Sequence, residues 1–423
     1  MGLELVTIPT ASLWNRTDVP DTDAIAVDLP DDDLAELESA ARRLAANGVD
    51  PVDAGPDDLP LGPVAPLVAE VRTEVLDGRG IALLRGFPVQ RCTVDEVALM
   101  FWGIGLRLGR AVSQRVMGER LGHVINVTDT DPHARAYRNR SELSPHSDPG
   151  DLLSFLCIRP AMTGGVSRFV SSLSVFDEIR RERPDLLVVL ARGFRYHRFG
   201  EEGPGDDPGT PHRVPVFSEC NGLVSGRFVR EYVEIAADKD HSIVLTDVER
   251  ETIGYLEATA NRPDLLAVLA RGFHYHRFGE QGPDDDPITP HRVPVFSERD
   301  GLVSGRYVRE YVEIAADEDP SIVLTNTDNE AISLLEATAN RPDLALDFTM
   351  AAGEAVVANN FTVFHARTAF TDDPDRRRHL LRLWLAADPP RPVVPETMTY
   401  PGEPGIPPQW GRTPSFASRF DNQ

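Results

Sequence analysis

Pro145-His146-Ser147-Asp148-Pro149 carries two metal-binding side chains at a spacing that one β-strand can present on a single face. Successive residues of a strand point to opposite faces, so His146 and Asp148 should project together into the interior. An imidazole and a carboxylate on one face, completed by a second imidazole from elsewhere, form a facial set of metal ligands that leaves coordination positions open. Chance alone gives about one His-x-Asp in a chain of this composition, so an incidental surface pair is the competing interpretation.

The distal half of the chain supplies a second imidazole and a basic cluster. An apolar run holds a lone histidine in Asn359-Asn360-Phe361-Thr362-Val363-Phe364-His365-Ala366-Arg367, and another follows in Arg378-His379-Leu380-Leu381-Arg382-Leu383-Trp384. His-x-Asp, the distant His and the trailing Arg-x-x-x-Arg together resemble the taurine dioxygenase (TauD/TfdA-like) family of Fe(II)/2-oxoglutarate-dependent oxygenases, within the clavaminate synthase-like superfamily. The resemblance extends from about Gly78 to Leu385.

This resemblance implies Fe(II), 2-oxoglutarate and O2 as cofactors and gives the motif residues their roles. His146, Asp148 and His365 would be the catalytic metal ligands. Arg378, the first Arg of Arg-x-x-x-Arg, would bind the far carboxylate of 2-oxoglutarate, because a guanidinium matches a carboxylate bidentately. Arg382 matches the position that binds an anionic substrate group, although on one strand it shares a face with Arg378 and can simply support it.

Two further residues belong to the predicted site. Ser167 follows Gly164-Gly165, where a turn requires glycine, and it matches a family position whose hydroxyl contacts 2-oxoglutarate; an ordinary strand serine is the alternative. Arg367 either lines the entrance or forms a surface ion pair. The resemblance also makes Asp148 informative, since halogenases of this class carry a small residue there, so a carboxylate favours hydroxylation.

Composition narrows the partners and the location. The formal net charge of −24 argues against nucleic acid and anionic membranes as partners. No run approaches about 18 consecutive apolar residues, and the N-terminus lacks a basic stretch followed by an apolar one. Three scattered cysteines fit a reducing compartment. We expect a cytoplasmic protein with a small-molecule substrate, anionic or amino-acid-like; self-association into a homo-oligomer is left open.

Residues 183–261 and 262–340 form a tandem repeat with a period of 79 residues and identity at 62 of the 79 positions. Each copy contains a predicted hairpin, which turns at Asn221-Gly222 in the first copy. Solenoids need several stacked units, so two near-identical copies indicate a recent duplication instead. Removing one copy shortens the separation of Asp148 and His365 from 217 to 138 residues, which suits the resembled family. One copy, or a composite of both, should complete the sheet.

The whole chain, 1–423, is predicted to be one oxygenase domain of the α+β class with a mainly β core. The resemblance implies a double-stranded β-helix (jelly roll, cupin-like) with flanking helices. The predicted parts are an N-terminal preamble 1–65, a first half of the core 66–182, repeat copies 183–261 and 262–340, a distal half 341–390 and a C-terminal tail 391–423. Helices are predicted near 32–44, 66–76 and 94–107, and strands near 81–87, 122–127, 151–158, 166–172 and 359–364.

The expected activity is hydroxylation of a small organic substrate with release of succinate and CO2. A desaturase or cyclising oxidase that uses the same site is one alternative. A metal-binding but inactive product of the duplication is the other.

Overall fold

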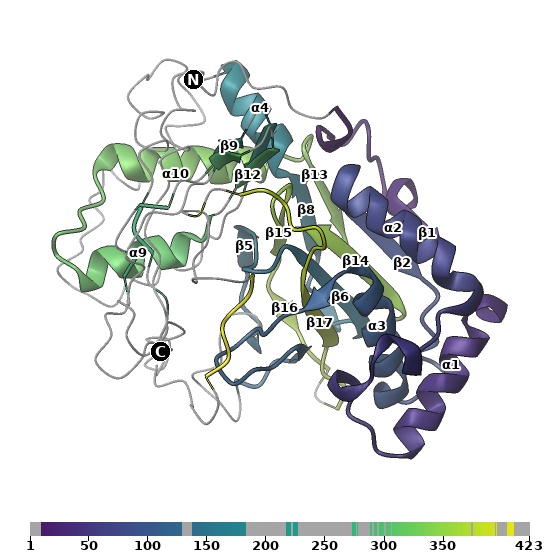
Figure 1. Cartoon of the computed structure of the whole chain (residues 1–423). Coiled ribbons are helices and arrows are strands. Elements are labelled where there is room, and N and C mark those ends of the chain that lie inside the picture. Colours follow the sequence, from purple (N-terminus) through teal and green to yellow (C-terminus); the bar gives the residue numbers. More distant parts are fainter. Residues whose placement is uncertain are drawn as a thin grey trace.

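A computed structural model describes residues 10–128, 138–182, 217–220, 223–226, 273–275, 277, 288–289, 292–293, 296–299, 302–305, 307–373, 375–393, 395 and 404–409. Most of the first repeat copy, the predicted turn Asn221-Gly222 and most of the C-terminal tail lie outside these residues. The protein is a mixed α+β structure with a mainly sheet core and flanking helices, as predicted (Figure 1). None of the helices in the described ranges is both long and apolar enough to cross a membrane.

The larger sheet has seven strands in the order β1-β2-β14-β6-β17-β3, with β4 also paired to β17. They are β1 (Ala26–Asp28), β2 (Ile81–Arg85), β3 (Arg110–Ala111), β4 (Leu121–Val124), β6 (Leu152–Arg159), β14 (Glu354–Asn359) and β17 (His379–Ala386). β14 runs antiparallel to β2 and β6, and β17 runs antiparallel to β6. These central strands are nearly continuous apolar runs because both faces of the sheet are covered.

A four-stranded sheet with the order β13-β8-β15-β5 faces the larger one. Its strands are β5 (Leu143–His146), β8 (Ser167–Ser171), β13 (Ala345–Phe348) and β15 (Val363–Arg367). A single buried cluster joins Ile81 and Leu83 of β2 to Phe169 of β8 and Leu346 of β13. The space between the two sheets is therefore an apolar core, and a two-stranded sheet of β7 (Thr163–Gly164) and β16 (Phe370–Thr371) lies beside it.

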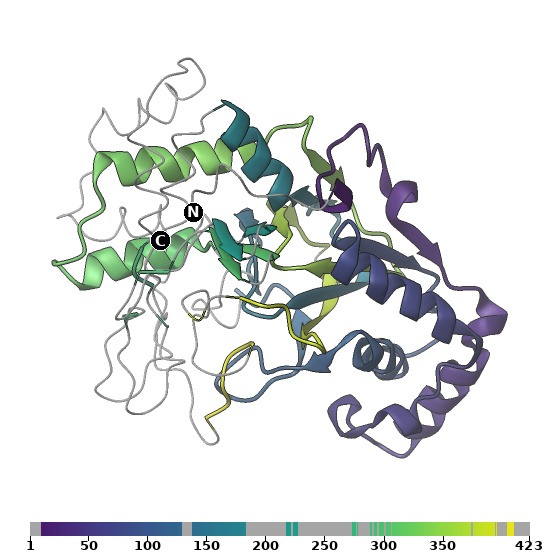
Figure 2. The same ribbon diagram turned by 45° about the horizontal axis from the view of Figure 1, so that its top comes forward.

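Helices cover the outer face of the larger sheet. They are α1 (Asp31–Ala46), α2 (Ala65–Asp77) and α3 (Val94–Leu108), with short 3-10 helices at Thr10–Ser12, Thr22–Ile25, Pro51–Asp53, Pro56–Asp58 and Gly62–Val64. A capping box of Thr93 and Glu96 starts α3. Phe101 and Trp102 of α3 are buried in the core that also contains Leu84 of β2, as the helical pattern predicts. Within residues 10–65, β1 is an edge strand of the larger sheet and α1 packs against α3 (Figure 2).

On the opposite side of the molecule lie α4 (Ser172–Glu182), α9 (Arg309–Glu318) and α10 (Asn326–Ala339), as both views show. Two hairpins lie with them, β9 (Phe217–Cys220) with β10 (Leu223–Gly226) and β11 (Phe296–Arg299) with β12 (Leu302–Gly305). β9 and β11 pair in parallel, so the equivalent positions Phe217 and Phe296 stand opposite each other. α4 contacts both β10 of the first copy and α10 of the second.

The prediction of one continuous strand over residues 359–364 is wrong. Asn359 ends β14, a turn follows, and β15 begins at Val363. The side-chain Oδ1 of Asn359 accepts a hydrogen bond from the N–H of Phe361 at 2.9 Å, and its carbonyl accepts one from Thr362 at 3.1 Å. Asparagine closes turns in this way, and it reverses the chain between the two sheets.

Candidate active site

β5 and β15 bring the two predicted histidine ligands together. His146 and His365 are direct partners across this antiparallel strand pair. Directly opposed residues project to the same side of a sheet, and the two ring centroids lie 4.0 Å apart. Strand pairing therefore supplies the distant imidazole that the sequence required.

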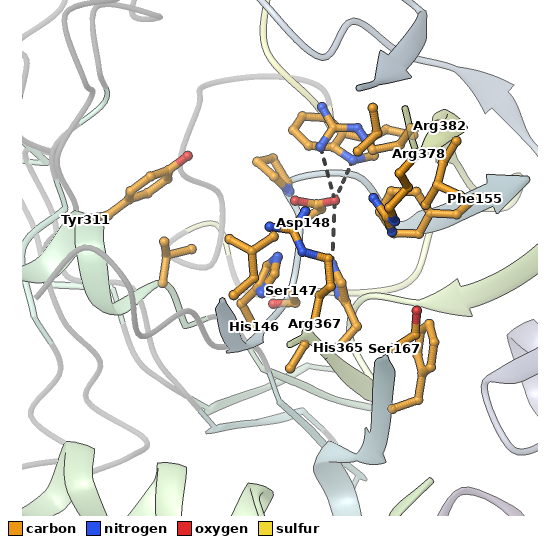
Figure 3. Close-up of a pocket in the computed structure, with 18 residues that line it drawn as sticks. His146, Ser147, Asp148, Phe155, Ser167, Tyr311, His365, Arg367, Arg378 and Arg382 are labelled. Carbon is orange, nitrogen blue, oxygen red and sulfur yellow. Dashed lines mark hydrogen bonds and ion pairs between the residues drawn. The ribbon is translucent and has the colours of Figure 1, made fainter. Parts of the chain in front are cut away.

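Asp148 joins the histidines from outside the strand. β5 ends at His146, so the prediction that one strand presents both residues is wrong. The backbone N–H of Asp148 donates to Oδ1 of Asn360 at 3.1 Å, and Nδ2 of Asn360 donates to the carbonyl of Gly150 at 2.9 Å. The turn after β14 thus fixes this segment, and Asp148 Oδ2 lies 3.9 Å from Nε2 of His365 (Figure 3).

The three side chains fit a metal ion. Their candidate ligand atoms lie within 4.8 Å of one another, and the part of the chain that the structure describes contains no other such group. Nδ1 of His146 lies 2.7 Å from the carbonyl oxygen of Ser144, so Nδ1 carries the proton and Nε2 keeps its lone pair. Burial lowers the pKa of His146, which favours the neutral imidazole that binds metals. Two imidazoles and a carboxylate are the ligand set of non-haem Fe(II) sites.

Trp384 and Arg382 orient the Asp148 carboxylate. The indole Nε1 of Trp384 donates to Asp148 Oδ2 at 2.8 Å, and Nη1 of Arg382 lies 3.9 Å from the same oxygen. Arg382 is itself fixed, because its Nε donates to Oε1 of Gln114 at 2.5 Å. Partners of this kind set the geometry of a metal ligand and raise metal affinity.

Arg378 is a buried cation that faces the same cavity. Its residue is only 6% exposed, and its guanidinium lies over the ring of Phe370 at 5.1 Å. Within the described ranges no acceptor lies at hydrogen-bonding distance from this guanidinium; only its backbone N–H is bonded, to Oδ1 of Asp372 at 2.7 Å. Burial lowers the pKa of Arg378 to about 10, so it remains a cation at neutral pH. A buried guanidinium of this kind fits the carboxylate of 2-oxoglutarate.

Ser167 and Arg367 also line the cavity, and they are partners across β8 and β15. Arg367 donates to the carbonyls of Asn139, at 3.2 Å, and Ser141, so it belongs to the cavity wall rather than to a surface ion pair. The turn before Ser167 needs glycine, as predicted. Gly164 has φ 72°, and a Cβ there would lie 2.2 Å from the carbonyl oxygen of Ala369.

The cavity has a volume of about 90 Å³ and lies between the two sheets and the second repeat copy. Several of its determinants escaped the sequence analysis: Trp384, Gln114, Asn360 and Tyr311. Trp384 had a signal, since it lies two residues after Arg382 on the same face of one strand. Asn360 had a weaker one, as a polar residue within an apolar run. Gln114 and Tyr311 had none, because their approach depends on tertiary packing.

Comparisons with known proteins agree with the fold and with the ligand set in the cavity. The family described as "Taurine catabolism dioxygenase TauD, TfdA family" matches residues 42–384. The protein is an Fe(II)- and 2-oxoglutarate-dependent dioxygenase. The chain belongs to the TauD, TfdA family.

Relatives and one solved structure are similar to it. The chain is 30% identical over 298 residues to FR-33289 synthase of Streptomyces rubellomurinus, covering 69% of this chain and 85% of that protein. It is 34% identical over 236 residues to a uridine-5'-phosphate dioxygenase of Streptomyces sp, 56% of each chain. An asparagine oxygenase solved with Fe(II), hydroxyasparagine and succinate shares the fold, with a TM-score of 0.51, 15% identity and coverage of 85% of this chain and 93% of that one.

Proposed function

We propose that this protein hydroxylates a small organic anion at the His146, Asp148 and His365 site. One observation carries the proposal: these three groups converge beside Arg378, a buried guanidinium with no hydrogen-bond acceptor in the described ranges. In the overall reaction a substrate C–H becomes C–OH, one atom of O2 enters the substrate, and the other enters the succinate formed with CO2 from 2-oxoglutarate. Bound Fe(II) and 2-oxoglutarate supply this oxidation.

The protein residues hold and orient the reactants. His146, Asp148 and His365 would ligate Fe(II), and Arg378 would bind the far carboxylate of 2-oxoglutarate with Ser167 on the neighbouring wall. The apolar side chains around them exclude water and strengthen every charge interaction in the cavity.

The charge of the cavity supports an anionic substrate. Among the described residues that line it, Arg367, Arg378 and Arg382 stand against one carboxylate, that of Asp148. Fe(II) and the two carboxylates of 2-oxoglutarate cancel in charge, so the cavity keeps a positive excess that favours a further anion. Arg382 is the residue proposed to attract it. One relative is named for a phosphate-bearing compound, uridine-5'-phosphate, and the asparagine oxygenase holds an amino acid, which makes carboxylates and phosphate-type anions the first classes to test.

The fold type, the tandem duplication and the cellular location are part of the same proposal. Two facing sheets whose central strands pair antiparallel support a double-stranded β-helix (jelly roll). Identity at 62 of 79 positions supports a tandem duplication. The low cysteine content and acidic charge support a cytoplasmic location.

The experiment is a screen of small carboxylates, amino acids and phosphonates for substrate-dependent succinate release under Fe(II), 2-oxoglutarate and O2. A substrate should raise succinate formation well above the slow rate seen without it, and should appear with one added oxygen by mass spectrometry. A protein that binds Fe(II) but forms no succinate with any class would contradict the proposal and favour an inactive duplication product.

A further inference from the structure

One part of the cavity wall comes from the repeat. Val308 and Tyr311, at the start of α9 in the second copy, line the cavity together with the residues of the two sheets. Figure 3 shows Tyr311 on one side and Phe155, Ser167 and Arg378 on the other, with His146 and Asp148 between them. Tyr311 therefore stands across the metal-ligand cluster from the proposed cosubstrate site.

Tyr311 is buried and packs against a second tyrosine. It is 7% exposed, and its ring meets the edge of Tyr275 at 6.5 Å between centroids. Arg309, two residues before it, forms buried ion pairs of 3.1 Å each with Glu313 of the same helix and Glu336 of α10. α10 in turn contacts β5, the strand that carries His146. The position of the phenol is thus coupled to the metal site by packing.

Chain connectivity favours the second copy over the first as the one that supplies the tyrosine to the cavity wall. α10 ends at Ala339 and β13 of the core begins at Ala345, so a short loop ties the α9 and α10 pair to the sheet. The identical counterpart of Tyr311 in the first copy is Tyr232, which is 79 residues further from β13 along the chain. Tyr232 follows the end of α4 by 50 residues, whereas Tyr311 precedes β13 by 34, and the shorter tether gives the second copy a modest advantage in effective concentration at equal sequence.

The small cavity makes this wall functionally important. The cavity of about 90 Å³ is lined by the metal ligands and by Tyr311, so a molecule that fills it contacts both. We propose that Tyr311 is a specificity-determining residue that limits the length of the anionic substrate, whereas its twin Tyr232 is not. The proposal rests on the function proposed above.

The first test measures where the two tyrosines lie relative to the metal. The full chain is labelled with 3-fluorotyrosine, and the signals of Tyr311 and Tyr232 are assigned with Tyr311→Phe and Tyr232→Phe variants. When Co(II) replaces Zn(II), the paramagnetic ion should shift or broaden the fluorine signal of Tyr311 far more than that of Tyr232. Equal effects on both, or a larger effect on Tyr232, would overturn the inference.

The second test measures selectivity without turnover. Binding of straight-chain alkylphosphonates, methyl to hexyl, is measured by calorimetry on protein loaded with Zn(II) and 2-oxoglutarate. Tyr311→Ala should strengthen binding of the longest chains by about tenfold or more, since each methylene that finds space is worth roughly that factor. Tyr232→Ala should leave the length profile unchanged; an unchanged profile in Tyr311→Ala, or a shifted one in Tyr232→Ala, would overturn the inference.

The two proposals fail differently. A chain that takes up no Co(II) contradicts the proposed function and removes the inference with it. A chain that takes up Co(II) but binds none of the phosphonates contradicts the anionic substrate class, and the fluorine comparison then decides the position of Tyr311. Normal metal uptake with no effect on the Tyr311 signal overturns the inference alone.

Discussion

The carboxylate of Asp148 owes its position to residues that are distant in the sequence. Its backbone is held by Asn360, and its Oδ2 by the indole of Trp384 at 2.8 Å. Removing one partner from a largely buried carboxylate costs more than an average hydrogen bond contributes, because the charge loses a donor that water cannot replace. The metal-ligand set is therefore a property of the folded site and not of the His-x-Asp triplet alone.

Arg378→Ala should raise the concentration of 2-oxoglutarate needed for half-maximal succinate formation by about two to four orders of magnitude. The physical reason is the loss of a buried, desolvated cation that pairs with a carboxylate, a loss of roughly 3–5 kcal/mol. Fe(II) content should stay at the wild-type level. Cosubstrate titrations with parallel iron analysis check this.

Arg376→Ala is the matched control, since Arg376 is an exposed arginine two residues earlier. It should leave the 2-oxoglutarate requirement unchanged. If Arg378→Ala behaved like this control, the cosubstrate role would pass to Arg382.

Trp384→Phe should weaken metal binding by about 10–100-fold while leaving the fold intact. Phenylalanine keeps most of the ring packing but loses the Nε1–H that donates to Asp148. Co(II) titration followed by absorbance measures the effect. Trp14→Phe is the control, because buried Trp14 loses an equivalent bond to the carbonyl of Arg79 outside the cavity lining; equal metal affinities in the two variants would show that the indole bond does not support the site.

Sequence periodicity correctly predicts which residues lie on each face of strand β17. Arg378 directly precedes it, and Arg378, Arg382 and Trp384 all line the cavity, as a two-residue period predicts for alternate positions. The intervening Leu381 and Leu383 pack under the helices on the other face. Here the local pattern was sufficient, because both faces of the strand are occupied and a shift by one residue would reverse them.

Sequence periodicity did not predict the turns next to the metal ligands. Sequence alone predicted a continuous strand from Asn359, but the Asn359 side chain accepts a hydrogen bond from the N–H of Phe361 and the strand breaks there. Asp148 also lies past the end of β5. Apolar runs predict strands. Breaks of this kind depend on whether a side chain or the neighbouring strand bonds the backbone, which is decided by the tertiary structure. Gln114 and Tyr311 come from segments with no motif, so only packing reveals them.

The two repeat copies are nearly identical in sequence, but their described parts have different neighbours. In the described ranges, hairpins of both copies join in one sheet, while the start of α9 in the second copy lines the cavity and α10 contacts β5. The first copy contacts α4 through β10, and the second copy contacts both α4 and β5 through α10.

Deleting 183–261 in frame should give a folded chain of 344 residues that binds Fe(II) and consumes 2-oxoglutarate at least as well as the full chain. The junction of Glu182 with Arg262 keeps the same Arg-Pro-Asp-Leu sequence, and the second-copy helix that lines the cavity is retained. Circular dichroism, iron analysis and succinate formation check the three expectations.

The reciprocal deletion of 262–340 is the control for local sequence, because it places Tyr232 where Tyr311 stands and should also be active. Soluble but metal-free protein from both deletions would show that both copies build the site.

The measurement that bears most directly on the account is the iron content of His146→Ala, Asp148→Ala and His365→Ala, each reconstituted anaerobically beside wild type. His123→Ala is the control, since His123 pairs with His379 away from the cavity. We expect one Fe(II) per chain in wild type and in His123→Ala, and a loss of at least about tenfold in metal affinity in each of the three variants with circular dichroism unchanged. Full iron occupancy in all three would place the metal elsewhere and contradict the central claim.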